Sequence, residues 1–505
     1  MKRLIPAVLL ATYLGGSAFA ADGGAAPDTL SLSLKEAIKQ AVEKNLDVKA
    51  ELFNPAAAEA DIHKYQGIYN PLLNLFSEYQ YMNTQTVNKF TTGGQALNRA
   101  QNVIYNAGIS QLLATGGTVG ASLNNNWNSN NSGIGIINDY FQSNLALNFT
   151  QPLLKSFGRE TTELNISLAR LGKEGSLDQF KTKLMSIISQ VRNQYYLLYS
   201  ARENLKVKKV SLDLAQTILN NTQSQVKAGV LPAMENLNAE FGLATQQKNV
   251  IDAERILKDQ VDALRLLLQM HEVTDIVPTE TPYTDTFQVD ENEAIKRALA
   301  ERPDLQRLRV TVTASELQAR VARNQTLPDL SLTGSAVLTG LDNRYHRDME
   351  YVGSGQYPVF TVGLQLTYPI GNYAAENAYI KSKLLVEQGK TQVKSLEESI
   401  SKDVRTAVRA VYSNYKQLEV TNRGRAYAEE VVQAYIKKQK VGLATTKDVL
   451  DVLNNQVTAE GNQILAVAEY NNAITNLWAT TGELLEKEGI RLNSKEADEL
   501  YEKSR

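Results

Sequence analysis

The chain has 505 residues, with 53 Lys and Arg against 55 Asp and Glu, three His and no Cys. The absence of Cys excludes disulfides, thiolate metal sites, cysteine nucleophiles and the acylated Cys of a lipoprotein. The near-zero net charge gives no electrostatic support for a nucleic-acid partner. Because the three His are scattered and no mature stretch holds about 18 consecutive apolar residues, we expect no metal ion, no cofactor and no membrane-spanning helix.

Residues 1–20 have the features of a secretory signal peptide. They begin with Lys2 and Arg3, continue with an apolar run at 4–14 and end in Ala-Phe-Ala at 18–20, a pattern typical of cleavage. A short membrane anchor is the alternative, and the short run and the cleavage pattern count against it. A polar linker follows at 21–30. We therefore expect the mature protein to work outside the cytoplasm.

The remainder of the chain is predicted to be a duplication. Glu-Ala-Ile-Lys at 36–39 recurs at 293–296, an offset of 257 residues, whereas Val-Arg at 191–192 recurs at 404–405, an offset of 213. The difference places 44 extra residues in the first copy, between Pro71 and Gly158. The predicted divisions are repeat 1 at 31–270, a linker at 271–291, repeat 2 at 292–487 and a charged, loosely ordered tail at 488–505.

Each repeat is predicted to contain a leading helix, a strand region and a long helical hairpin. The leading helices are expected at 34–65 and 292–323, the strand regions at 71–152 and 328–369, and the hairpins at 160–270 and 374–487. The first helix of each hairpin is near 68 residues, or about 100 Å long. Apolar residues spaced four and three apart from Leu184 to Leu205, with Arg202 among them, predict a coiled-coil seam. An ordinary coiled-coil scaffold remains the alternative.

The strand regions favour a membrane barrel. Segments 141–151 and 360–368 alternate apolar residues with small or polar uncharged ones, as transmembrane barrel strands do. A soluble sheet, which usually has charged residues on its wet face, is the alternative. The 44 extra residues predict two more strands at 103–113 and 118–127, or else an external hairpin above the barrel. The asparagine-rich segment 124–133 is predicted to be an external loop.

Four motifs resemble those of the TolC-like family of outer-membrane efflux proteins, and the resemblance covers about residues 32–485. They are LSLKEAIKQAVEKNLDVKA at 32–50, LNFTQPLLKSFGRE at 147–160, LQLTYPIGN at 364–372 and VGLATTKDVLDVLNNQ at 441–456. The resemblance implies an α+β membrane protein, a homotrimer whose strands share one transmembrane barrel continuous with a periplasmic helical barrel. Four or six strands per chain cannot close a barrel alone, so three chains would supply 12 or 18.

The resemblance also implies a function. The chain would be a passive exit duct in the outer membrane of a Gram-negative cell, in contact with outer-membrane lipid, for small molecules or polypeptides. A periplasmic adaptor and an inner-membrane transporter of the RND, ABC or MFS type would be its partners. The alternative function is a secreted or periplasmic coiled-coil structural protein.

The family's hairpin tips close the periplasmic entrance and contact the adaptor. The matching tip residues are Ala228, Gly229, Val230, Leu231, Val441, Gly442, Leu443 and Ala444. The acidic constriction falls on Asp448 and Asp451, with Glu235 in the first repeat, and rings of such carboxylates would favour cations. Alternatively, these acids are ordinary first-turn residues stabilised by the helix dipole. The family's basic latch position is Ala444 here, so that latch is not carried over.

Catalytic motifs are incomplete. Gly-Lys-Thr at 389–391 resembles the end of a P-loop, but position 384 is Leu where the motif needs Gly. His271 and Glu272 are followed at position 275 by Asp, where a metalloprotease helix has its second His. We therefore do not expect an enzyme.

Overall fold

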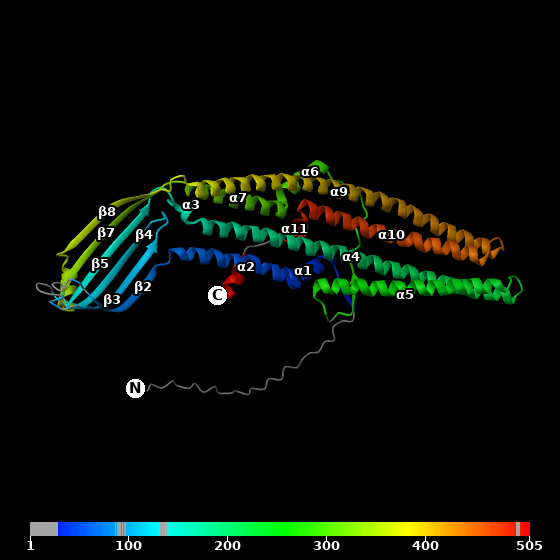
Figure 1. The fold of residues 1–505 in the computed structure, drawn as a ribbon. Helices are drawn as coiled ribbons and strands as arrows, with labels where there is room; N and C mark the ends of the chain where they lie inside the picture. The colour runs from blue at the N-terminus through cyan, green and yellow to red at the C-terminus, as the bar shows by residue number, and fades with distance from the viewer. Residues whose placement is uncertain are drawn as a thin grey trace, which may run out of the picture.

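The computed structural model describes residues 29–85, 97–131, 139–271, 273–490 and 495–504, together with positions 87, 92, 94 and 137. The predicted signal peptide and most of the following linker lie outside the described residues. In the described part, a six-stranded sheet at one end is joined to long helices that extend away from it (Figure 1). None of the described helices is both long enough and apolar enough to cross a membrane.

The leading helix of each repeat is broken in two. In repeat 1, α1 (Leu34–Lys44) begins with a capping box between Ser33 and Glu36, and α2 (Leu46–Gln66) follows. Asn45 separates them because its side chain accepts hydrogen bonds from the first backbone N–H groups of α2 and donates to the Leu267 carbonyl at 2.9 Å. In repeat 2, the break between α6 (Glu291–Glu301) and α7 (Pro303–Asn324) lies at Arg302, where the following proline disfavours helical backbone.

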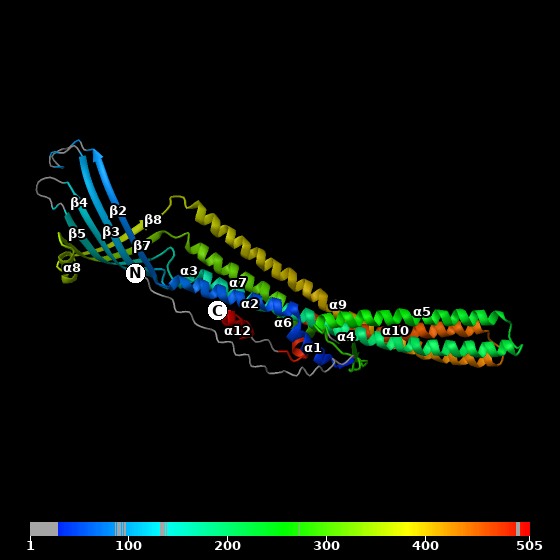
Figure 2. The same cartoon turned by 90° about the horizontal axis from the view of Figure 1, so that it is seen from below.

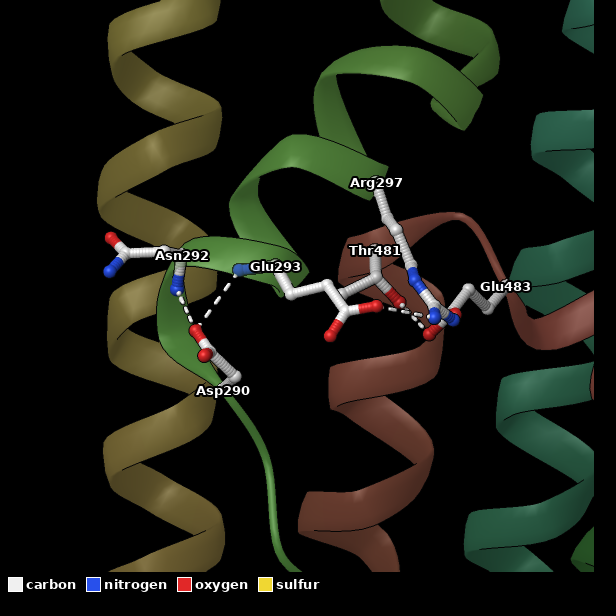
Figure 3. Close-up of polar contacts among 6 residues, drawn as sticks. All are labelled: Asp290, Asn292, Glu293, Arg297, Thr481 and Glu483. Carbon is white, nitrogen blue, oxygen red and sulfur yellow. Dashed lines mark hydrogen bonds and ion pairs between the residues drawn. The ribbon is translucent and has the colours of Figure 1, made fainter.

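Helix α6 is fixed to the end of the second hairpin (Figure 3). The Asp290 side chain caps α6 by accepting hydrogen bonds from the N–H groups of Asn292 and Glu293 at 2.8 and 3.2 Å. Arg297 then joins Glu293, at 2.8 Å, to Glu483. The hydrogen bond with Glu483, followed by the one with Glu293, raises the pKa of the Arg297 guanidinium, which therefore stays charged at any physiological pH.

The long helices form two antiparallel hairpins that run side by side (Figures 1 and 2). The first hairpin consists of α4 (Leu164–Lys227) and α5 (Met234–Leu268), and the second of α9 (Tyr373–Lys440) and α10 (Thr446–Thr481). The short helices α3 (Arg159–Thr162) and α11 (Leu484–Lys487) precede the first hairpin and follow the second. Helix α4 has 64 residues and α9 has 68, so they are about 96 and 102 Å long. In the predicted seam, Leu184 and Tyr195 are fully buried, whereas Arg202 donates to the Ile276 carbonyl at 2.9 Å.

The six strands of the two strand regions form one antiparallel sheet in the order β2-β3-β4-β5-β7-β8. Their bounds are β2 Leu72–Gln85, β3 Leu97–Leu112, β4 Thr118–Asn130, β5 Asp139–Pro152, β7 Asp329–Asp342 and β8 Pro358–Thr367. The extra residues of the first repeat thus supply β3 and β4 between β2 and β5. They do not form a hairpin standing apart from the sheet.

The prediction of an external loop at 124–133 is wrong for 124–130, which belong to β4; residues 132–136 lie outside the described part. The register places Asn124 between Asn106 and Asn144, on one face of the sheet. Farther along that face, Asn128 donates to Asn102, and Asn102 donates to Gln80 at 3.1 Å. Asparagine is unfavourable in an isolated strand, but here the amides bond one another across strands.

Several smaller elements are not visible in the sequence pattern. Strand β1 (Thr29–Leu32) pairs in parallel with β6 (Asp275–Pro278), η1 (Gly67–Tyr69) follows α2, and α8 (Tyr345–Ser354) lies between β7 and β8. The tail, predicted to be loosely ordered, contains helix α12 (Lys495–Ser504), which packs on α2. Tyr501 stacks on His63 at 5.2 Å, and Lys173 lies between Glu59 and Asp498.

Candidate functional site

The two faces of the sheet differ in chemistry. One, which we call the apolar face, carries Leu145, Leu147 and Phe149 of β5 in line with residues such as Leu332 and Leu338 of β7. The other, the polar face, carries mainly amides and hydroxyls, as in the row Asn106, Asn124, Asn144 and Thr339 across β3, β4, β5 and β7. Small side chains such as Gly108 and Gly120 leave a hollow of about 310 Å³ in the polar face. Lipid on one side and water on the other would produce this alternation.

The turn between β3 and β4 lies at the helical end of the sheet. The Thr115 carbonyl accepts hydrogen bonds from the Gly158 N–H at 3.0 Å and from the Gln151 amide at 3.1 Å. Gly116 has a φ of +85°, and an added Cβ would lie 2.4 Å from the Ser156 carbonyl oxygen, so the turn fits tightly against the chain between β5 and α3. These contacts support β3 and β4 as full members of the six-stranded sheet.

Within the described part of a single chain, no strand pairs with the two outer edges of the sheet. Strands β2 and β8 are the outermost strands, and every residue of β2 is exposed. The exposed side chains include large apolar groups, among them Leu75 at 73% and Val362 at 80%. Free strand edges next to an exposed apolar face require another chain or lipid to cover them.

The two hairpin tips have the same backbone turn. Gly229 and Gly442 both have a φ of +75°, a left-handed conformation that favours glycine. In the first tip the Val230 N–H donates to the Gln225 carbonyl, and in the second the Leu443 N–H donates to the Lys438 carbonyl, each at 2.9 Å. In each tip the glycine N–H donates to the carbonyl one residue farther along the helix, Val226 in the first and Gln439 in the second, which completes the Schellman motif that ends a helix. The duplicated glycines therefore reflect a duplicated turn.

The predicted adaptor-contacting residues surround these turns. Leu231 and Ala444 are half-buried, and the others are exposed: Ala228, Gly229, Val230, Val441, Gly442 and Leu443. Val230 is 70% exposed and Leu443 is 77% exposed. The tips therefore present apolar groups to their surroundings, as a protein-contacting surface does.

The three predicted constriction acids are not equivalent. Asp448 forms a capping box, accepting hydrogen bonds from the backbone N–H and the hydroxyl of Thr445, both at 2.8 Å. The backbone bond, then the hydroxyl bond, lowers the pKa of Asp448. Glu235, from the other hairpin, accepts a hydrogen bond from the Thr446 N–H at 3.1 Å. Asp451, one turn farther along α10, is exposed and has no hydrogen bond or ion pair with the described residues.

The structure thus places Glu235 and Asp448, both assigned to the constriction from the sequence, at the N-terminus of α10; the hydrogen bond from the Thr446 N–H to Glu235 was not predicted. The hairpins also pack closely there, because Gly242 of α5 leaves room for Leu450 of α10, whose Cδ1 would lie 2.6 Å from an added Cβ. Behind them, Gln246 donates to Asn454 at 2.7 Å. In the sequence, Gly242 is the one signal that could have indicated this close approach of α5 and α10. No three acidic or histidine side chains of the described residues gather as a metal site would require.

Comparison with known proteins identifies relatives of both repeats. The profile of the family described as outer membrane efflux protein matches residues 37–268 and 294–483, well over half of the chain. The pyoverdine export outer membrane protein OpmQ of Pseudomonas aeruginosa is 25% identical over 191 residues, which are 37% of this chain and 38% of that protein. The outer membrane efflux protein BepC of Brucella suis is 25% identical over 34% of this chain and 36% of its own length. The matched segments thus span little more than a third of these relatives.

Solved structures share the fold over almost the whole length. The outer-membrane channel OprN has a TM-score of 0.65 at 15% identity, covering 89% of this chain and 90% of its own. The CmeC outer membrane channel of Campylobacter jejuni has a TM-score of 0.63 at 15% identity, covering 93% and 89%. The predicted resemblance to TolC-like channels is confirmed. With the profile matched in both repeats and the fold shared from the sheet to the helices, the chain belongs to the outer membrane efflux protein family.

Proposed function

We propose that three copies of the chain close their sheets into one 18-stranded barrel and act as a passive exit duct across the outer membrane. The observation that carries the proposal is the continuity of the six-stranded sheet, apolar on one face and polar on the other, with helices about 100 Å long. The long helices would form the periplasmic tunnel, and the polar face of the sheet would line the exit.

The strand order is suited to closure by copies of the same chain. Because neighbouring strands alternate in direction, β2 and β8 run in opposite directions, so β8 of one copy can pair antiparallel with β2 of the next. With strands about 4.8 Å apart and tilted by about 40°, 18 strands give a barrel about 36 Å across, against about 24 Å for 12 strands. The added β3–β4 pair would therefore widen the exit by half.

The tips would form the periplasmic entrance. Exposed apolar residues such as Val230 and Leu443 suit contact with a periplasmic adaptor, and an inner-membrane transporter of the RND, ABC or MFS type would supply the energy. Asp451 would be the acid that lines the constriction, because Asp448 and Glu235 already accept hydrogen bonds from backbone N–H groups at the N-terminus of α10. A ring of three such carboxylates would favour cations over anions.

Fractionation and planar-bilayer recording of the full chain test this function. We expect a heat-modifiable oligomer in the outer membrane fraction that conducts ions through a water-filled path without an added energy source. A soluble periplasmic species that conducts nothing would overturn the proposal and favour the coiled-coil scaffold.

A further inference from the structure

Helix α8 lies against the apolar face of the sheet, at the end far from the long helices (Figure 2). The Tyr345 ring contacts Phe141 of β5 with centroids 5.6 Å apart and Tyr105 of β3 at 6.2 Å. Both partners belong to the apolar face by register, and Val352 of α8 is 3% exposed. The connection between β7 and β8 therefore folds back over the outside of the wall and leaves the polar face free.

A buried carboxylate fixes α8 in this position. Asp348 is fully buried, accepts a hydrogen bond from the Ser143 N–H at 3.1 Å and also contacts the Ser143 hydroxyl. The backbone of α8 comes so close to β7 that a Cβ at Gly340 would lie 2.1 Å from the Asp348 carbonyl oxygen. Helix α8 is thus seated on the wall by specific contacts and presents a constant set of residues on its outer side.

Helix α8 lies where the apolar band of the wall ends. On β7 the apolar face runs from Leu330 to Leu338 and then reaches Gly340; on the neighbouring β5 it runs from Phe149 to Leu145 and then reaches Ser143. Eight residues of a strand tilted by about 40° rise about 20 Å. This height is close to that of the apolar band of outer-membrane barrels, which is about 25 Å. Since α8 begins to cover the wall at the far edge of that band, it lies at the level of the lipid headgroups.

The exposed side of α8 has the chemistry of a membrane interface. Arg344 and Arg347 are exposed, and neither forms an ion pair with another described residue. Tyr357, 56% exposed, packs against Tyr351 with ring centroids 5.8 Å apart. Glu350 is the exposed acid of the helix. Tyrosine is enriched at headgroup level, and the arginine guanidinium matches the geometry of phosphate oxygens.

We propose that α8 docks the phosphate groups of outer-leaflet lipid headgroups, with Arg344 and Arg347 binding the phosphates and the tyrosines lying at the acyl boundary. Three features favour this docking: the depth of α8, its fixed seat on the apolar face, and two arginines that form no ion pair with the described residues. It requires that the apolar face contact the outer membrane, and it does not depend on transport through the duct.

The test compares two lipids on the full chain. The protein, purified from outer membranes in detergent, is incubated with lipid A that carries two phosphates or with the same lipid after its phosphates are removed, and bound lipid is counted by native mass spectrometry. We expect the phosphorylated lipid to be retained about 30-fold more tightly, from the contribution that each arginine makes near an anionic surface. Equal retention of the two lipids would overturn the proposal.

Variants of α8 supply the matched controls. Arg344→Gln with Arg347→Gln should abolish the preference, whereas Glu350→Gln should strengthen it, because it removes the competing negative charge. Retention of the full preference by the double arginine variant would also overturn the proposal. The comparison of lipids on the unaltered chain decides the question even where a variant fails to assemble. Since single-channel conductance should not change in any of these variants, a negative lipid result would leave the duct proposal intact.

Discussion

Glu235→Ala is expected to loosen the contact between the two hairpin tips. The Glu235 carboxylate joins α5 to α10 through the Thr446 N–H at 3.1 Å, and Thr446 is buried in the intact chain. A hydrogen bond to a charged group contributes about 1.5–3 kcal/mol, and about 1 kcal/mol is reasonable for a half-buried carboxylate. If the bond breaks when the entrance opens and three copies open together, the substitution favours the open state by about 3 kcal/mol, or about 150-fold.

Single-channel recording in planar bilayers measures this change as the ratio of open to closed time. Glu240→Ala is the matched control, because Glu240 is an exposed acid on the same helix without an ion-pair partner among the described residues. We expect a large rise in open time for Glu235→Ala and none for Glu240→Ala. An unchanged ratio in Glu235→Ala, or an equal rise in both variants, would refute the role assigned to the bond with Thr446.

Three further predictions concern the entrance and the wall. Asp448→Asn with Asp451→Asn should weaken block of the channel current by divalent cations; unchanged block would count against the constriction. Because hydrogen bonds from Thr445 hold the pKa of Asp448 below its ordinary value, the capping box is intact at neutral pH and is lost as the pH falls through that lowered pKa. Thr445→Ala should raise this pKa toward about 3.9 in a carboxyl NMR titration, and no shift would contradict the capping role. Because the chain has no Cys, single cysteines can be labelled in intact cells with an impermeant maleimide. Ala114→Cys in the β3–β4 turn should stay unlabelled, whereas Val87→Cys, beyond the other end of β2, should react. Labelling of position 114 would contradict the topology.

The duplication could be predicted because it fixes backbone geometry as well as residue type. Gly158 and Gly371 have φ values of +96° and +95°, just as the tip glycines Gly229 and Gly442 share one value. Only glycine adopts such conformations without strain, so the same residue recurs at the same place in each copy. The strand pattern was equally informative, because a register with a period of two must separate the apolar face from the polar one.

Other features depend on contacts between distant residues, which no local pattern reveals. Helix α8 is held by Asp348 against Ser143, 205 positions away in the sequence. Helix α12 packs on α2, and its Asp498 accepts a hydrogen bond from Lys173 of α4, 325 positions away in the sequence. The same applies to Glu235, whose partner Thr446 lies in the other repeat. Local composition predicted a loosely ordered tail at 488–505 and an external loop at 124–133. Tertiary contacts instead hold α12 of the tail against α2, and strand pairing places residues 124–130 in β4.

Electron cryo-microscopy of the full chain, purified from outer membranes, would show directly how many copies and strands form the barrel. We predict three copies around one axis and a single closed wall of 18 strands, with β8 of each copy paired to β2 of the next and the polar face lining an open lumen. A wall of 12 strands with β3 and β4 standing outside it, or a single copy with free β2 and β8 edges, would contradict the account.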